Sequence, residues 1–221
     1  MIKATLSHEQ ARLAYRRLGG ALDVVGVYEN IASRKLIRHA HLERAASVFE
    51  LGCGTGAFAQ MALEKHLPGH AVYKAIDVTP EMVASTKKRL EKFGDRVRIE
   101  LSEGAPPTAE PTGAYDRFIS NYVFDLLSEA DISAILVEAH RMLSSEGLLC
   151  LSGLAPAQGP LSKVCVGLWS KIYEHKPSWV GGCRPIQLLP FIDSASWVVL
   201  YHGLVTPLGF PLEVVVAKKR A

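Results

Sequence analysis

The sequence predicts an α/β fold in which helices cover both faces of a mostly parallel, doubly wound sheet. Between residues 47 and 152, short apolar runs alternate with longer segments of helical periodicity, the order that builds parallel sheets. Gly52, Gly54 and Gly56 directly follow the first apolar run, and an acid, Asp77, ends the second. Ligands of open parallel sheets bind at the carboxyl ends of strands, so this edge is the expected site.

The elements of the sheet follow from local signals. Strands are predicted at 47–51, 71–76, 97–101, 116–120 and 148–151, and two closing strands at 197–201 and 213–217. Helices are predicted at 57–65, 79–92 and 128–146. The last helix begins with a capping-box pattern at Ser128 and Asp131, and Gly147 is expected to end it.

We expect one domain over residues 1–221, with two additions to the sheet and its helices. Residues 1–45 form a helical N-terminal cap in this prediction. Residues 153–190 form a lid-like insert, which is rich in proline and aromatic residues and contains the pair Gly181–Gly182. A compact sheet rarely needs so long an irregular connection unless that connection covers a binding site.

Composition narrows the function classes. The 221 residues are 48% hydrophobic and 21% charged, which fits a folded domain, and a net charge of +3 gives no sign of a nucleic-acid partner. The four cysteines are far apart, so neither a disulfide framework nor a metal site is expected, and the setting is predicted to be cytoplasmic. Glycines and prolines interrupt the uncharged stretch 194–212, which therefore predicts two strands and no transmembrane segment.

The segment Glu50-Leu51-Gly52-Cys53-Gly54-Thr55-Gly56 carries the most specific signal. Its third glycine comes one position too early for the GxGxxG fingerprint of nicotinamide cofactors. Glu50 would repel a pyrophosphate and attract a cationic ligand, whereas Asp77 is placed to accept hydrogen bonds from ribose hydroxyls. Together these residues indicate a nucleoside that carries positive charge elsewhere.

These residues resemble the E/D-x-G-x-G-x-G loop and second-strand acid of class I S-adenosylmethionine-dependent methyltransferases, over residues 45–152. The resemblance implies a Rossmann-like sheet of seven strands with an antiparallel closing hairpin, and S-adenosylmethionine as cofactor. It also implies that Glu50 positions the methionine end, that Asp77 holds the ribose and that Val78 touches the adenine. The cofactor site expected from the resemblance comprises Glu50, Gly52, Cys53, Gly54, Gly56, Asp77, Val78, Glu103 and Asn121.

Four residues are candidates for catalysis, and no metal is expected. Asn121 and Tyr122 would lie at the end of the fourth strand, beside the methyl group. Tyr28 and Tyr122 are candidates to face the sulfonium through a cation–π contact, although aromatic residues more often fill cores. His175, in the insert, is the candidate general base, against the alternative of a surface histidine. Cys53 is expected to be a small packed residue rather than a nucleophile.

The chemistry expected is methyl transfer by in-line displacement, for which the protein mainly supplies alignment. The motif Asn-Pro-Pro-Tyr is absent after the fourth strand, which argues against amine methylation on bases or glutamine. The apolar, aromatic insert favours a small organic acceptor, lipophilic or aromatic, and in this the chain resembles methyltransferases of quinone and natural-product biosynthesis. The alternatives are an NAD(P)-dependent oxidoreductase and a non-catalytic cofactor-binding partner subunit, and a homodimer stays open.

Overall fold

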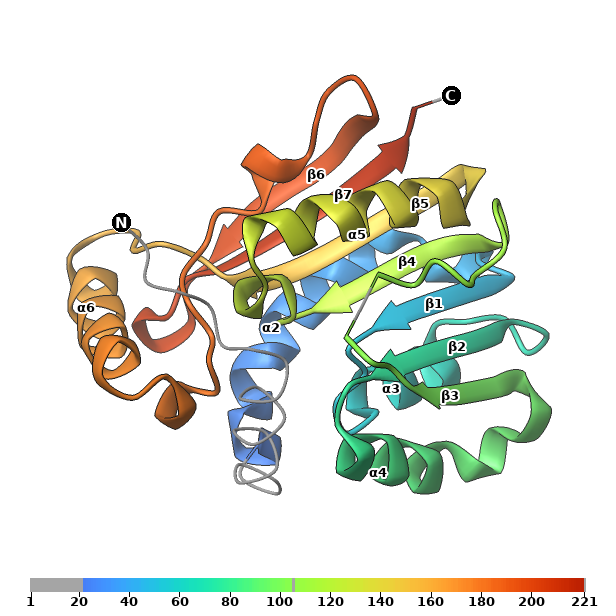
Figure 1. The fold of residues 1–221 in the computed structure, drawn as a ribbon, viewed down its shortest axis with the longest axis horizontal. Helices are drawn as coiled ribbons and strands as arrows, with labels where there is room; N and C mark the ends of the chain where they lie inside the picture. The colour runs from blue at the N-terminus through green and yellow to red at the C-terminus, as the bar shows by residue number, and fades with distance from the viewer. Residues whose placement is uncertain (1–21, 105, 221) are drawn as a thin grey trace.

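The structure is a computed structural model that describes residues 22–104 and 106–220, with the side chains of 31–104, 106–177 and 179–220. Its seven-stranded sheet has the order β3-β2-β1-β4-β5-β7-β6 (Figure 1). The first five strands are parallel, and β7 runs antiparallel to both of its neighbours. The expected doubly wound sheet with a closing hairpin is thereby confirmed. The strands are β1 (Ser47–Leu51), β2 (Val72–Asp77), β3 (Val97–Leu101), β4 (Tyr115–Asn121), β5 (Leu143–Leu154), β6 (Trp197–Val205) and β7 (Leu212–Lys219).

Helices cover the two faces of the sheet unequally. Buried side chains of α2 (Leu22–Ala40), α3 (Ala57–Lys65) and α4 (Pro80–Leu90) form one core cluster with one face of the strands. On the other face, α5 (Glu129–Met142) packs with residues of the insert in a second cluster. Figure 1 shows α5 in front of the sheet and α2 behind it.

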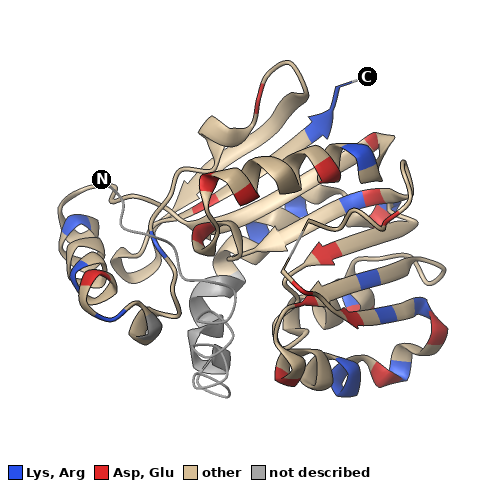
Figure 2. Cartoon of the chain, viewed as in Figure 1, with Lys and Arg blue, Asp and Glu red and all other residues tan. Residues whose placement is uncertain are grey.

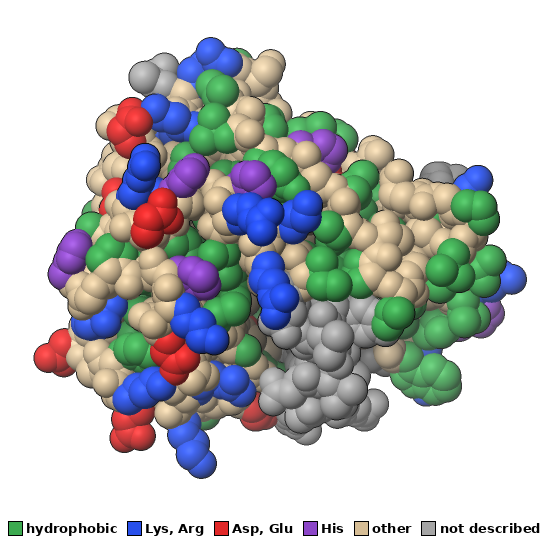
Figure 3. Space-filling model, turned by 180° about the vertical axis from the view of Figure 1, so that it is seen from behind, with side chains coloured by type: hydrophobic (Ala, Val, Ile, Leu, Met, Phe, Trp, Pro, Cys, Tyr) green, Lys and Arg blue, Asp and Glu red, His purple; other side chains and the backbone are tan. Residues whose placement is uncertain are grey.

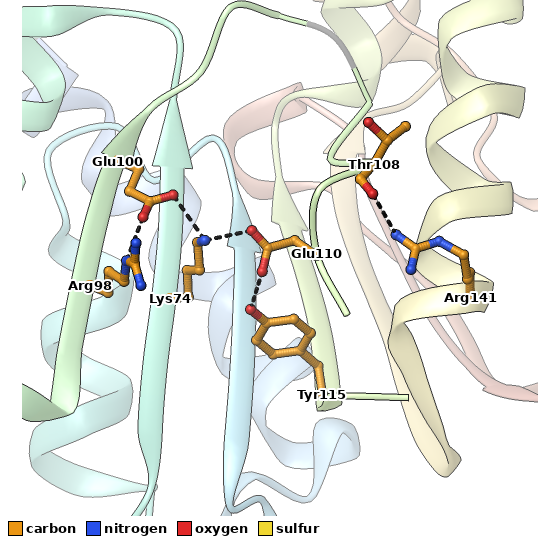
Figure 4. A network of polar contacts seen from close by, with 7 residues as sticks. All are labelled: Lys74, Arg98, Glu100, Thr108, Glu110, Tyr115 and Arg141. Atoms are coloured by element: carbon orange, nitrogen blue, oxygen red, sulfur yellow. Dashed lines mark hydrogen bonds and ion pairs between the residues drawn. The ribbon is translucent and has the colours of Figure 1, made fainter. Parts of the chain in front are cut away.

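The connection between β3 and β4 contains no helix in its described part, and a polar network holds it instead (Figure 4). The carboxylate of Glu110 lies 2.5 Å from Lys74 Nζ on β2, and it accepts a hydrogen bond of 2.5 Å from the hydroxyl of Tyr115 on β4. Arg141 of α5 donates to the carbonyl of Thr108 at 3.2 Å. The network fixes this connection against strands and a helix that are distant in sequence.

The start of α5 agrees with the prediction and its end does not. Ser128 Oγ accepts a hydrogen bond from Asp131 N at 3.1 Å, as the capping-box pattern indicates. The helix ends at Met142 rather than at Gly147, because Leu143 already pairs with Tyr115 in the sheet and is fully buried. A Cβ on Gly147 would meet the Leu143 side chain at 2.8 Å, so Gly147 serves this packing and not a helix end.

The insert lies at the end of the sheet where β1, β4 and β5 finish (Figure 1). It contains α6 (Pro160–His175) and the short 3-10 turns η5 (Pro177–Val180) and η6 (Leu189–Phe191). The later part of the insert is hydrogen-bonded to the end of β5 and the start of β7. Ile186 N donates to Leu154 O at 3.0 Å, and Leu188 N donates to the Glu213 carboxylate at 2.6 Å. Among the described residues, no helix is long and apolar enough to cross a membrane.

Candidate functional site

The loop after β1 needs its glycines for two different reasons. Gly52, Gly54 and Gly56 have φ values of 77°, 51° and 77°, in the left-handed region that side chains rarely adopt. A Cβ on Gly52 would lie 2.2 Å from Val123 Cγ2, and one on Gly56 would lie 2.8 Å from Thr86 Cγ2. A Cβ on Gly54 would meet nothing within 4 Å. Gly52 and Gly56 therefore allow close packing within the chain, whereas Gly54 borders open space.

Asp77, at the end of β2, joins this loop to the next turn. Its Oδ2 accepts a hydrogen bond from Gly54 N, and its Oδ1 accepts one from Thr79 N, both at 2.9 Å. Burial raises the pKa of the carboxyl, and these backbone donors oppose that rise. Each oxygen keeps a second lone pair, so the carboxylate can still accept hydrogen bonds from a ligand.

Glu50 lies near the end of β1, the strand next to β2, and its side chain is buried, with only 1% exposed. Its Oε2 accepts a hydrogen bond of 2.9 Å from the hydroxyl of Tyr73, on β2. Burial raises the pKa of Glu50 to about 8, and the nearby Asp77 adds to the rise, whereas Tyr73 and the Asn121 amide favour the ionised form. Glu50 is therefore a buried acid that a cation would ionise.

Asn121 and Tyr122 stand at the end of β4, between the ends of β1 and β5. Ser152 Oγ donates to Asn121 Oδ1 at 2.7 Å, and the buried Asn121 Nδ2, which lies close enough to Glu50 to favour its ionised form, completes no hydrogen bond with the described part of the chain. Tyr122 has a φ of 56°, a strained conformation for a large residue, and its N donates to Ser152 O at 2.8 Å. Such strain concentrates at functional sites.

Cys53 is buried within the glycine loop, and its thiol lies 3.8 Å from Thr86 Oγ1. Burial raises its pKa, and the nearby acids Glu50 and Asp77 raise it further, so the thiol stays protonated. Thr86 Oγ1 donates to Gly54 O at 2.7 Å and thereby fixes the open part of the loop. These contacts suit packing and give Cys53 none of the features of a nucleophile.

The residues expected near an adenine lie at the neighbouring strand ends. Val78 follows Asp77 and is half-buried, and Glu103 is exposed in the turn after β3. Ser102 N donates to Asp77 O at 2.8 Å, which brings this turn against the end of β2. The order of the sheet thus places Val78 at the end of the strand next to β1, and Glu103 one strand further from the glycine loop.

Among the described side chains, the structure does not bring the other two catalytic candidates, His175 and Tyr28, to this cluster. His175 is exposed at the last residue of α6, where its ring Nδ1 lies 2.9 Å from Lys171 O. The backbone of Tyr28 belongs to α2, and its side chain lies outside the described residues.

Three residues of the site were missed by sequence reasoning. They are Tyr73, which donates to Glu50, Thr86, which holds Gly54, and Val123, which packs against Gly52. Tyr73 and Thr86 lie 23 and 32 residues from the residues that they bind. The one signal in the sequence that could have indicated Tyr73 and Thr86 was a hydroxyl group at a position that the pattern of apolar residues assigns to the core.

The comparisons with known proteins agree with this geometry. Residues 48–147 match the methyltransferase domain family. The chain is 29% identical over 158 residues to nocamycin O-methyltransferase of Saccharothrix syringae, covering 67% of this chain and 55% of that protein. It is 30% identical over 148 residues to malonyl-[acyl-carrier protein] O-methyltransferase of Bacillus cytotoxicus, covering 63% and 49%. The chain thus spans about half the length of these relatives.

Solved structures show the same fold. Geranyl diphosphate C-methyltransferase of Streptomyces coelicolor, in complex with S-adenosyl-L-homocysteine, superposes with a TM-score of 0.66 at 16% identity, over 87% of this chain and 79% of that one. The [4+2]-cyclase SpnF superposes with a TM-score of 0.64 at 14% identity, over 86% and 80%. By strand order the chain has the fold of these solved structures, and its residues 48–147 are similar to the methyltransferase domain family.

Proposed function

We propose that this chain transfers a methyl group from S-adenosylmethionine to a small organic acceptor. The observation that carries the proposal is the pair of buried acids at neighbouring strand ends, Glu50 on β1 and Asp77 on β2, with Asp77 bonded to the open backbone at Gly54. The cofactor, when bound, supplies a methyl group activated by a sulfonium. The alternative of an NAD(P)-dependent oxidoreductase fits neither the glycine spacing nor the carboxylate of Glu50, and none of the relatives reported above has that activity.

The residues present fit this cofactor. Glu50 would attract its cationic methionine end, and Asp77 would accept hydrogen bonds from the ribose hydroxyls with the lone pairs left by Gly54 N and Thr79 N. The buried Asn121 Nδ2 would donate to a polar group of the cofactor or acceptor, which satisfies a donor that is otherwise costly to bury. Val78 and Glu103 would contact the adenine.

An apolar acceptor is supported by half-buried aromatic side chains that pack against one core cluster. Tyr122, Trp169 of α6 and Phe210 before β7 are half-buried and pack against the same core cluster. The rings of Trp169 and Phe210 lie 5.7 Å apart at 72°, and Trp169 Nε1 donates to Cys183 O at 2.9 Å, so their positions are fixed. We propose that residues 153–190 act as a lid and residues 1–45 as a cap over this space, with Tyr28 and Tyr122 facing the sulfonium.

The finer assignments of partner and place also belong to the proposal. We propose a small molecule rather than a nucleic acid as acceptor, a homodimer as assembly, and the cytoplasm as location, with His175 kept as the candidate base. The net charge of +3 supports a small-molecule acceptor over a nucleic acid. The absence of any disulfide among the four described cysteines supports the cytoplasm as location.

Calorimetry with S-adenosylhomocysteine tests the cofactor site. Asp77→Asn removes the charged acceptor proposed for the ribose hydroxyls, and a hydrogen bond to a charged group contributes about 1.5–3 kcal/mol, so affinity is expected to fall about tenfold or more. The matched control Asp95→Asn, at an exposed acid of another turn, should bind as wild type does. Binding of NADH instead of S-adenosylhomocysteine by the wild-type chain would refute the proposal.

Transfer of a labelled methyl group tests catalysis separately. The fold alone does not decide this point, because the superposed SpnF is described as a cyclase. A screen of phenols, thiols, amines and quinone-like compounds should yield a labelled product. Tight binding of S-adenosylhomocysteine without transfer to any of them would favour the non-catalytic partner subunit.

A further inference from the structure

The outer face of α6 carries large apolar side chains in water. Leu161, Val164 and Leu168 are 65%, 70% and 63% exposed, and their spacing of three and four residues places them on one side of the helix. The opposite side holds the buried Ser162, Val166 and Tyr173. A helix with a second apolar face beyond the one it packs against the protein is unusual in a monomer.

Leu208 extends this face from outside the helix, and Trp179 is exposed just beyond the end of α6. Leu208, in the turn before β7, is 71% exposed, and its carbonyl lies 3.9 Å from Cys165 Sγ of α6. Trp179, in η5 just after α6, is 67% exposed, and Lys176 Nζ lies 4.7 Å from its ring. We call Leu161, Val164, Leu168, Trp179 and Leu208 the α6 surface. Figure 3, seen from behind, shows hydrophobic side chains gathered at the α6 end of the molecule.

The charges around the α6 surface are mostly positive. Residues 160–180 contain Lys163, Lys171 and Lys176 against a single acid, Glu174, and all four are exposed. Figure 2 shows mostly basic positions along α6 and just after it, whereas acidic and basic positions are mixed over the rest of the fold. An apolar helix face with a tryptophan and flanking lysines is the pattern of helices that lie in a membrane interface and bind anionic lipids.

We propose that the α6 surface docks on an anionic lipid bilayer. The apolar side chains would enter the boundary between headgroups and acyl chains, and the lysines would face the negative headgroups. This proposal rests on the exposure of the apolar side chains and on the positive charge of the flanking lysines. It does not depend on which residues take part in catalysis. If the proposed function holds, a docked α6 would bring the proposed lid to the source of a lipophilic acceptor.

Vesicle sedimentation with the full chain tests the docking. The probes are phosphatidylcholine vesicles with and without phosphatidylglycerol, at low and high salt. The wild-type chain should bind the anionic vesicles more tightly, and salt should weaken that binding. Val164→Gln with Leu168→Gln removes two apolar side chains without changing charge or helix propensity much, and partitioning should fall about tenfold or more.

Two further variants separate the contributions. Val137→Gln, at a residue of α5 that is 67% exposed, is the matched control and should bind vesicles as wild type does. Lys171→Gln with Lys176→Gln should lower binding to anionic vesicles about fivefold per lysine and leave neutral vesicles unaffected. Calorimetry with S-adenosylhomocysteine should show wild-type affinity for all variants, which distinguishes failure of this proposal from failure of the proposed function.

Three results would overturn the proposal. The first is no binding of the wild-type chain to anionic vesicles, or an equal loss in Val137→Gln. The second is a wild-type dimer in sedimentation that Val164→Gln with Leu168→Gln dissociates, which would assign the surface to a second copy. The third is faster hydrogen exchange of residues 1–21 in that variant without vesicles, which would assign the surface to the N-terminal segment of the same chain.

Discussion

The buried acid Glu50 leads to a specific prediction for the pH dependence of cofactor binding. Burial raises its pKa to about 8, so at pH 7 about one molecule in eleven has the ionised carboxylate. Ionising the rest costs about 1.4 kcal/mol at pH 7, a tenfold factor in affinity. A cationic cofactor should therefore drive out a proton, about 0.9 per molecule bound at pH 7, and its affinity should rise as the pH approaches 8.

Calorimetry in buffers of different ionisation enthalpy measures this proton release. Glu50→Gln should abolish the contribution of Glu50 and weaken binding, and Asp95→Asn should leave the release unchanged. The α-amino group of the cofactor also titrates at about pH 8. Because it does so with both proteins, the difference between the wild-type and Glu50→Gln curves isolates the carboxylate. Identical proton release by the two proteins from pH 6 to 9 would refute the reasoning.

The same pKa shift affects stability without ligand. Because the pKa of Glu50 is raised in the folded chain, the folded state holds the proton where the unfolded state has lost it. The free energy of unfolding is therefore expected to fall as the pH rises from 4.5 through about 8. Glu50→Gln should remove this part of the slope in denaturant unfolding, and an unchanged slope would contradict the shifted pKa.

The remaining predictions concern the loop and its supports. Gly52→Ala brings a Cβ within 2.2 Å of Val123, so it should lower the melting temperature, and this clash should cost about 1–3 kcal/mol in stability in addition to the backbone strain of a positive φ. Gly54→Ala, which faces open space, should cost only about 1–2 kcal/mol in backbone strain but should weaken S-adenosylhomocysteine binding in calorimetry. Equal losses of stability in the two variants would contradict their separate roles. Tyr73→Phe removes a donor to Glu50 and should raise the pKa of that carboxyl, so the pH profile of cofactor binding should move upward. An unmoved profile would exclude Tyr73 as a positioning residue.

Local signals predicted most elements of the fold because turns and caps mark their ends. The helix predicted at 57–65 is α3, and the strand predicted at 97–101 is β3, each with the predicted bounds. The end of α5 was predicted wrongly, since helical periodicity continues past the residue where pairing with β4 begins. A contact with a distant strand decided that boundary, and local spacing carries no record of it.

The site divides in a similar way. Spacing alone located the glycine loop, Glu50 and Asp77, and the structure brings them together at one edge of the sheet. The hydrogen bond from Tyr73 to Glu50 had no local signal, because its two residues come from different strands. The exposure of the α6 face was equally hidden, since its periodicity reads as that of an ordinary packed helix.

The sequence by itself determined the order of strands and helices, the glycine backbone of the loop and the acids at two strand ends. These features depend on neighbouring residues and on the fixed periods of helix and strand. Only the tertiary structure decided that Gly54 borders open space, that Glu50 is an acid with a raised pKa, and which side of α6 meets water. Burial and desolvation depend on which distant segments pack together, and that packing exists only once the chain has folded.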